Sequence, residues 1–220
     1  MKTLVINFKT YEEATGRNAE TLAKICRDVL RENDAEIIVC PQYADLKMVS
    51  NFGVKVFSQH IDPVLPEKNT GAITALSVKS SGAFGTLLNH SEKKLTPAQL
   101  KQCVSIAKDY GLTVLCFTKD LKETREVLKL EPDMIAYEPA ELVGSGKSVS
   151  KNKPKTLASF VRLVRKTNPN VKVLCGAGIS NGDDVKKAIE FGVDGVALSS
   201  AFVKAANPEY LLKEIVSSLK

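Results

Sequence analysis

The chain has 220 residues, of which 44% are apolar and 25% charged, and its formal net charge is +6. This composition is typical of one globular domain and excludes disordered, collagen-like and disulfide-stapled chains. The charge does not indicate a nucleic-acid partner, because the lysines are interspersed with acidic residues, as over 119–129, whereas nucleic-acid binders concentrate charge on one face. A small anionic substrate fits the charge equally well.

The sequence also argues against a membrane protein and against a zinc-binding protein. No apolar run approaches the ~20 residues needed to cross a bilayer, and the first residues turn polar too soon for a signal peptide. We therefore expect a cytoplasmic protein without a membrane partner. The five cysteines are odd in number and lack Cys-x-x-Cys spacing, so neither a disulfide framework nor a zinc site is indicated, and we expect most of them to be buried apolar residues.

In the first half of the chain, apolar runs bounded by turn residues alternate with amphipathic segments. The sequence Thr-Pro-Ala-Gln from Thr96 is a strong helix start, with a threonine cap, a proline at the first helical position and a glutamine that completes a capping box. The loop over 59–71 is too long for a simple connector. We expect strands over 3–8, 35–40, 54–58 and 84–88, and helices over 18–32, 43–50, 72–80 and 96–110.

The second half continues this alternation, which gives eight strand-helix units in all. Parallel strands covered by helices are expected from such a pattern, and eight of them favour a closed (β/α)8 barrel, the TIM barrel, as a single domain over 1–220. A doubly wound open sheet is the alternative, weakened because no Gly-x-Gly-x-x-Gly follows the first strand. The remaining strands are expected over 112–117, 133–137, 171–175 and 194–198, and the helices over 120–130, 154–167, 183–191 and 208–219.

Glu138 ends the sixth expected strand and is followed by Pro139, so it lies where a barrel enzyme keeps its chemistry. Residues 139–150 have too few apolar positions at helical spacing to predict a helix. They include Gly144 and Gly146, which allow backbone amides to approach a ligand closely. A carboxylate before a glycine loop suggests a general base with a lid, although a carboxylate there can also simply cap a turn.

Polar residues follow two other strands. Asn7 and Lys9 flank the end of the first strand, where an ammonium could meet an anion at the barrel mouth or simply lie in solvent. His90 follows the fourth strand, and a helical turn begun by Ser91 and Glu92 would favour a neutral imidazole that donates a hydrogen bond. A lone histidine is more often structural, and we expect the other one, His60, to be a loop residue.

Small residues follow the last two strands. Gly176, Ala177 and Gly178 come after the seventh strand, and Ser199 and Ser200 after the eighth. Loops at these places, with the amino end of a short extra helix, commonly form a phosphate cup of backbone amides in barrels. Small residues are needed because a larger side chain would block the approach.

These motifs together resemble the triosephosphate isomerase family over the whole chain, and specifically its shorter archaeal branch. They occur in the family's order: Asn7-Phe8-Lys9, then His90-Ser91-Glu92, then Tyr137-Glu138-Pro139 with the lid residues 144–147, and finally Gly176-Ala177-Gly178. Each motif alone is modest evidence, whereas the four in this order and spacing are highly specific.

The resemblance implies interconversion of dihydroxyacetone phosphate and glyceraldehyde 3-phosphate, in glycolysis and gluconeogenesis, without a metal or organic cofactor. Glu138 resembles the base that moves the proton, His90 the electrophile that polarises the carbonyl, and Lys9 the cation that steadies the negative charge. Asn7 is expected to position Lys9 and the substrate. The resemblance assigns phosphate binding to Val143, Gly144, Gly178, Ser199 and Ser200.

The resemblance also implies a homo-oligomer, with the long loop after the third strand inserted into a neighbour and a tetramer favoured over a dimer. The chain departs from the usual pattern near the lid: Glu141 stands where most members have tryptophan, Ala140 where archaeal relatives usually have proline, and Ser145 replaces the usual threonine. We expect these differences to affect the stiffness of the lid hinge and not the chemistry.

Two other functions share some of these features. Another phosphate-binding barrel, acting on a ribose-linked or thiamin-related substrate, would share the phosphate cup but would have no obvious use for His90 and Glu138. A catalytically silent barrel that binds anions or serves as a scaffold would not need the set of Lys9, His90 and Glu138.

Overall fold

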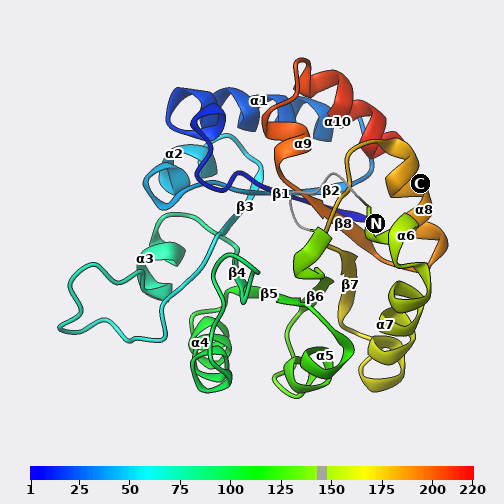
Figure 1. Ribbon diagram of the computed structural model, residues 1–220. Coiled ribbons are helices and arrows are strands. Elements are labelled where there is room, and N and C mark those ends of the chain that lie inside the picture. Colours follow the sequence, from blue (N-terminus) through cyan, green and yellow to red (C-terminus); the bar gives the residue numbers. More distant parts are fainter. Residues whose placement is uncertain (143–147) are drawn as a thin grey trace.

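A computed structural model describes residues 1–142 and 148–220 of the chain. Within these residues, eight parallel strands form a closed barrel in which each strand pairs with the next and β1 pairs with β8 (Figure 1). The predicted (β/α)8 barrel is thereby confirmed, since an open sheet would leave β1 and β8 unpaired. The strands are β1 (Thr3–Asn7), β2 (Glu36–Cys40), β3 (Lys55–Ser58), β4 (Gly85–Leu88), β5 (Thr113–Thr118), β6 (Met134–Tyr137), β7 (Lys172–Cys175) and β8 (Gly195–Leu198).

Helices surround the barrel (Figure 1). Most of them begin and end within a few residues of the predicted bounds, and residues 154–167 match the prediction at both ends. The helices are α1 (Arg17–Arg31), α2 (Leu46–Ser50), α3 (Ala75–Ser80), α4 (Pro97–Asp109), α5 (Leu121–Leu128), α6 (Val149–Asn152), α7 (Pro154–Thr167), α8 (Gly182–Glu190), α9 (Ser200–Val203) and α10 (Pro208–Ser217), with 3-10 turns η1 (Glu12–Ala14), η2 (Tyr43–Asp45) and η3 (Ala140–Leu142).

The prediction that residues 139–150 contain no helix is wrong at both ends of that segment. The turn η3 follows Pro139 directly, where the Leu142 amide donates to the Pro139 carbonyl at 2.9 Å. Helix α6 begins at Val149, and the Val149 amide donates to the Ala177 carbonyl of another loop at 3.2 Å. Apolar periodicity does not reveal such short turns, because a few hydrogen bonds, one of them tertiary, hold them in place.

The capping box predicted at the start of α4 is present. The Thr96 hydroxyl accepts from the Gln99 amide at 3.3 Å, and the Gln99 side chain accepts from the Thr96 amide at 3.0 Å. Two amides that the helix leaves unpaired are thus satisfied, which fixes where α4 begins.

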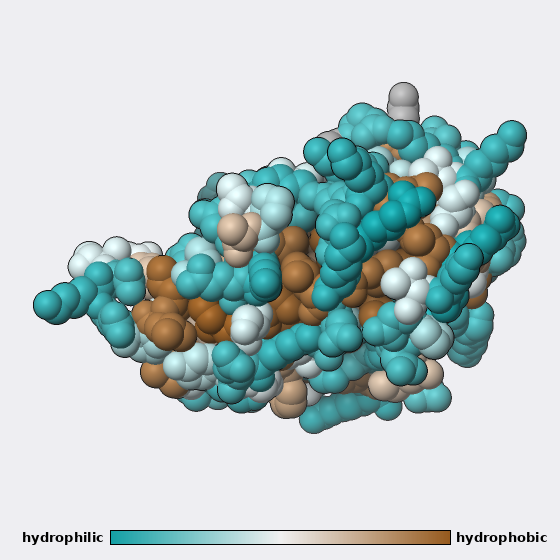
Figure 2. All heavy atoms as spheres, turned by 90° about the horizontal axis from the view of Figure 1, so that it is seen from below, coloured by the Kyte–Doolittle hydropathy of each residue, from teal (hydrophilic) through white to brown (hydrophobic). Residues whose placement is uncertain are grey.

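The long loop between β3 and α3 extends away from the barrel (Figure 1). It carries Leu65, whose side chain is 54% exposed. Figure 2 views the molecule from the side on which α4 and α5 lie in Figure 1, and hydrophobic residues there form a band between hydrophilic ridges.

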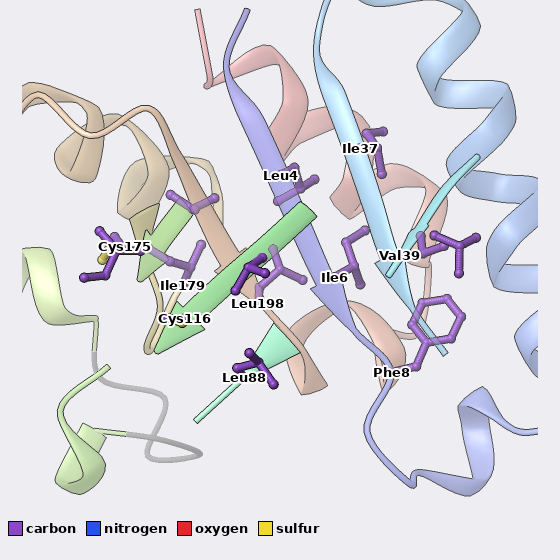
Figure 3. Packing of buried hydrophobic residues seen from close by; sticks show 14 of the residues in the cluster. Leu4, Ile6, Phe8, Ile37, Val39, Leu88, Cys116, Cys175, Ile179 and Leu198 are labelled. Carbon is purple, nitrogen blue, oxygen red and sulfur yellow. The ribbon is translucent and has the colours of Figure 1, made fainter. Parts of the chain in front are cut away.

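Buried apolar side chains form two clusters because successive residues of a strand point to opposite faces. In β1, Leu4 and Ile6 belong to the larger cluster, which also contains helix residues, whereas Val5 belongs to the smaller one. Figure 3 shows Leu4 and Ile6 among members of the larger cluster, which lies between the strands and the helices. The smaller cluster is made of strand residues and fills the barrel interior. The prediction that most cysteines are buried is confirmed, since all five are buried, and all five are free.

The amino ends of the strands carry an ionic network around the buried Glu36, at the end of the barrel opposite the strands' carboxyl ends. Glu36 in β2 is 8% exposed, and it accepts from Thr3 in β1 at 2.7 Å, from Lys172 in β7 at 2.9 Å and from Lys55 in β3. Four strands are therefore tied together at this floor, which leaves the carboxyl ends for the site.

Candidate active site

The carboxyl ends of the strands surround a cavity of about 290 Å³. It collects residues that are far apart in sequence but that lie at or after the carboxyl ends of strands. Among its lining residues are Asn7, Lys9, His90, Glu138, Gly178, Ser199 and Ser200, all predicted from the sequence, together with Phe117, Gly176, Ala177, Ile179, Ser180 and Lys204. The predicted Val143 and Gly144, and the lid residues 144–147, lie outside the described residues.

Glu138 is brought to the cavity by the end of β6. Its amide donates to the Thr118 carbonyl of the neighbouring β5 at 2.8 Å, which continues the sheet one residue past the strand. The residue is only 4% exposed. Its two carboxylate oxygens meet two donors from the loop after β4: Oε1 lies 3.1 Å from His90 Nε2, and Oε2 accepts from the Ser91 amide at 3.2 Å.

The protonation pattern of His90 follows from its neighbours. The Glu92 amide lies 3.2 Å from Nδ1, and because an amide can only donate, Nδ1 acts as the acceptor. The Glu92 carboxylate is more distant, 3.8 Å from Nδ1. A neutral imidazole in this position carries its proton on Nε2, the nitrogen that faces Glu138. The Glu92 amide belongs to a turn over residues 91–93, in which the Lys93 amide donates to the His90 carbonyl. The helical turn predicted here is not formed.

The ring of His90 is fixed from two sides. It packs edge-on against Phe117, with ring centroids 5.0 Å apart. The preceding residue, Asn89, has a φ of 60° and donates to the Phe117 carbonyl and to Glu123, both at 3.0 Å. Since a left-handed backbone is tolerated best by glycine and asparagine, this residue type suits the turn that aims His90.

Lys9 reaches the same cavity from the end of β1. It has a φ of 48°, and its amide donates to the Asn7 side chain at 2.9 Å, so Asn7 stabilises a strained turn. Gln59 supports that turn by donating to the Lys9 carbonyl at 2.8 Å. The Lys9 ammonium lies 2.7 Å from Glu92, an exposed carboxylate at the cavity edge. A flexible surface partner of this kind leaves the ammonium available to an anionic ligand.

The predicted small residues also line the cavity. A Cβ added to Gly176 would lie 3.2 Å from the Tyr137 carbonyl and 3.4 Å from the Glu138 Cβ, so glycine allows β7 to approach the base closely. Gly178 has a φ of 72°, which glycine adopts without strain. Ser199 directly precedes α9, the short extra helix, and its buried hydroxyl has no partner within the described residues.

Several cavity residues were not predicted. Phe117 lies near the end of β5, and Gln59, which supports Lys9 from outside the cavity lining, follows β3, so the rule that strand ends carry function could have pointed to both. Ser180 and Lys204 lie further along their loops, and no sequence signal singles them out. His60 is in the loop after β3, as predicted; it is buried, and burial lowers its pKa, although Asp62 at 3.3 Å opposes this.

The hinge positions can be described in part. Glu141, at a position where tryptophan is usual, is exposed and forms an ion pair with Lys153 just before α7. Within the described ranges 1–142 and 148–220, no three His, Cys, Asp or Glu side chains are grouped as metal ligands would be. In the same ranges, every helix is too short or too polar for a bilayer-spanning segment.

Comparison with known proteins gives a consistent answer. The model of the family described as triosephosphate isomerase matches residues 2–219. The triosephosphate isomerase of Methanocaldococcus jannaschii is 44% identical over 214 residues, covering 97% of this chain and 98% of that protein. The triosephosphate isomerase of Methanosarcina mazei is 42% identical, and the match covers 97% of this chain and 96% of that protein. That of Methanothermus fervidus is also 42% identical, and the match covers 98% of each chain.

The sequence motifs, the closed barrel and the arrangement of polar residues in its mouth agree with these matches. A family model that spans nearly the whole chain, with relatives above 40% identity over almost their full lengths, establishes the assignment. This chain belongs to the triosephosphate isomerase family.

Proposed function

We propose that the protein interconverts dihydroxyacetone phosphate and D-glyceraldehyde 3-phosphate, the reaction that its family name describes. The observation that carries the assignment of roles is the His90–Glu138 pair, 3.1 Å apart in a cavity that Lys9 also lines. A base, a neutral hydrogen-bond donor and a cation are the three groups that proton transfer next to a carbonyl requires.

In the forward direction, Glu138 takes a proton from the hydroxymethyl carbon of the ketone. The electrons of that C–H bond form the new carbon-carbon double bond, and the carbonyl π electrons move to oxygen, giving an enediolate. His90 donates from Nε2 to this oxygen and Lys9 lies beside it, so the developing negative charge is stabilised by several kcal/mol in a dry site. The proton of the C1 hydroxyl passes through His90 to the former carbonyl oxygen, so a new carbonyl forms at C1. Return of the proton from Glu138 to the neighbouring carbon C2 then gives the aldehyde.

This scheme requires Glu138 to change partners when substrate binds. In the structure, His90 and the Ser91 amide both contact the Glu138 carboxylate. The substrate carbonyl needs the same His90 donor, so the carboxylate turns from His90 and Ser91 toward the carbon acid. Loss of these hydrogen bonds leaves a carboxylate with fewer donors, and therefore a more reactive base.

Phosphate binding supplies energy from a part of the substrate that does not react. We assign it to Gly178, Ser199 and Ser200, which line the same cavity as Lys9. Within the described part of the chain, the Gly178 amide has no protein hydrogen-bond acceptor, which suits an anion site. Val143 and Gly144 complete the proposed phosphate contacts, as the family resemblance implies.

We propose a homo-oligomer, with a tetramer favoured over a dimer. The loop between β3 and α3 extends from the barrel and exposes Leu65, which suits insertion into a neighbouring subunit. The hydrophobic band in Figure 2 offers a second apolar contact surface. The cytoplasm is the compartment we propose, because five free cysteines suit reducing conditions.

A coupled assay tests the activity directly: purified protein supplied with glyceraldehyde 3-phosphate should produce dihydroxyacetone phosphate, detected by its reduction with NADH and glycerol-phosphate dehydrogenase. An absence of turnover would contradict the proposed function. It would favour instead a silent anion-binding barrel, or a barrel acting on a ribose-linked or thiamin-related substrate, for which the His90–Glu138 pair has no evident role.

A further inference from the structure

Asp184 is a buried carboxylate in the first turn of α8, next to the phosphate half of the cavity but not among the residues that line it. Its side chain is 4% exposed. Oδ1 lies 2.7 Å from the Lys151 ammonium, and Oδ2 accepts from the Ser180 amide at 3.0 Å and from the Ser180 hydroxyl at 2.8 Å. Both oxygens are therefore committed to residues outside α8.

These partners belong to two segments that meet at the site. Ser180 lines the cavity two residues after Gly178, whereas Lys151 lies in α6. Two further bonds hold α6 here: the Ser150 hydroxyl donates to the Asp184 carbonyl of α8 at 3.3 Å, and the Val149 amide donates to the Ala177 carbonyl of the loop after β7 at 3.2 Å. Asp184 in α8 thus bonds to both segments, and it connects α6 with the loop after β7 beside their direct Val149–Ala177 bond.

The simplest alternative is that Asp184 stabilises the start of α8 and nothing more. That task is already performed by Asn181, whose side chain accepts from the Asp184 amide at 3.0 Å. The exposed neighbour Asp183 also places a negative charge in the same turn, which favours the helix dipole without burial. Burying a second carboxylate is costly unless donors surround it, so its three donors point to a more specific task.

We propose that Asp184 is a positioning residue for the phosphate end of the substrate, an inference that rests on the proposed function. By holding the Ser180 amide and hydroxyl, it fixes the turn from Gly178 to Ser180 in the conformation that binds phosphate, and through Lys151 it fixes α6 against that turn. Asp184 should affect the binding of the phosphate group and not the proton transfer, because its side chain bonds to Ser180 and Lys151 and not to Glu138, His90 or Lys9.

Asp184→Asn tests this, since asparagine keeps the shape but loses the charge and one acceptor. We expect the inhibition constant of inorganic phosphate and the KM for glyceraldehyde 3-phosphate to rise roughly tenfold, as small displacements of a binding loop do. Deuterium uptake from D2O into glyceraldehyde, which has no phosphate, should proceed at the wild-type rate. Asp183→Asn, with the same charge change in the same turn, is the control and should leave all three quantities unchanged.

Lys151→Gln gives a second test should Asp184→Asn fold poorly, because it removes one partner at the surface and should weaken phosphate binding in the same direction. An unchanged phosphate inhibition constant in both variants would overturn the inference, as would equal losses with glyceraldehyde and glyceraldehyde 3-phosphate, which a merely structural role predicts. A wild-type protein that lacks isomerase activity would contradict the proposed function itself.

Discussion

At the scale of single residues, the site depends on hydrogen-bond direction. His90 is a donor toward the reacting groups only because the Glu92 amide occupies its other nitrogen. The sequence places His90, Glu138 and Lys9 at strand ends, and therefore in one barrel mouth, because parallel strands share an edge. The turn that supplies the Glu92 amide, and the Gln59 contact that supports Lys9, depend on tertiary geometry that no local pattern encodes.

His90→Asn removes this donor, because the shorter amide does not reach the position of Nε2. We expect kcat to fall by roughly 10² to 10³, the loss typical of one oxyanion donor. The comparison is His60→Asn, a change at the chain's other histidine, which does not line the catalytic cavity. A steady-state assay of both variants checks this, and equal losses of kcat in the two would refute the assigned role.

At the scale of elements, the sequence predicts those parts whose signals are local. Helix α4 carries its own capping box, and the buried strands carry continuous apolar runs. The segments α6 and α9, four residues each, were missed or expected only as an unspecified extra helix, because such short segments show no apolar periodicity. A bond to the Ala177 carbonyl of another loop also holds the start of α6. The start of α3 is a local signal that was overlooked, since this helix begins at Ala75 after the Thr74 cap and not at the predicted residue 72.

Thr96→Ala removes the hydroxyl that accepts from the Gln99 amide. The free energy of unfolding should fall by about 1 kcal/mol, the usual value for a lost threonine cap, with kcat unaffected since α4 lies outside the cavity. Urea unfolding followed by circular dichroism measures the change. Thr96→Ser keeps the acceptor and should retain most of the stability; a serine variant as unstable as the alanine variant would rule out the cap as the cause.

At the scale of the whole molecule, stability and chemistry occupy opposite ends of the barrel. The Glu36 network ties β1, β2, β3 and β7 together at the floor, and the reactive groups lie at the mouth. Burial alone raises the pKa of Glu36, but hydrogen bonds from Lys172, Lys55 and Thr3 outweigh it and lower the pKa to about 2 from an ordinary 4.5. The ionised form is therefore favoured by folding.

A carboxyl group whose pKa is lower in the folded than in the unfolded state stabilises the fold at pH values above its unfolded-state pKa. This stabilisation is lost as the pH falls through the folded-state pKa. The contribution of Glu36 should thus be complete above pH 4.5 and disappear between pH 4.5 and about 2. Denaturant unfolding at several pH values in this window should show a steeper loss of stability for the wild type than for Glu36→Gln. Glu209→Gln, a change at an exposed glutamate, should keep the wild-type slope, and equal slopes in all three proteins would contradict the assignment.

The central claim is that Glu138 is the base of a triose phosphate isomerase, and the coupled assay of Glu138→Gln tests it most directly. The amide keeps the size of the side chain but cannot accept the substrate proton, so kcat should fall by roughly 10² to 10⁴ or more. Competitive inhibition by inorganic phosphate should remain, because Gly178, Ser199 and Ser200 are intact. A Glu138→Gln variant with wild-type kcat would contradict the account.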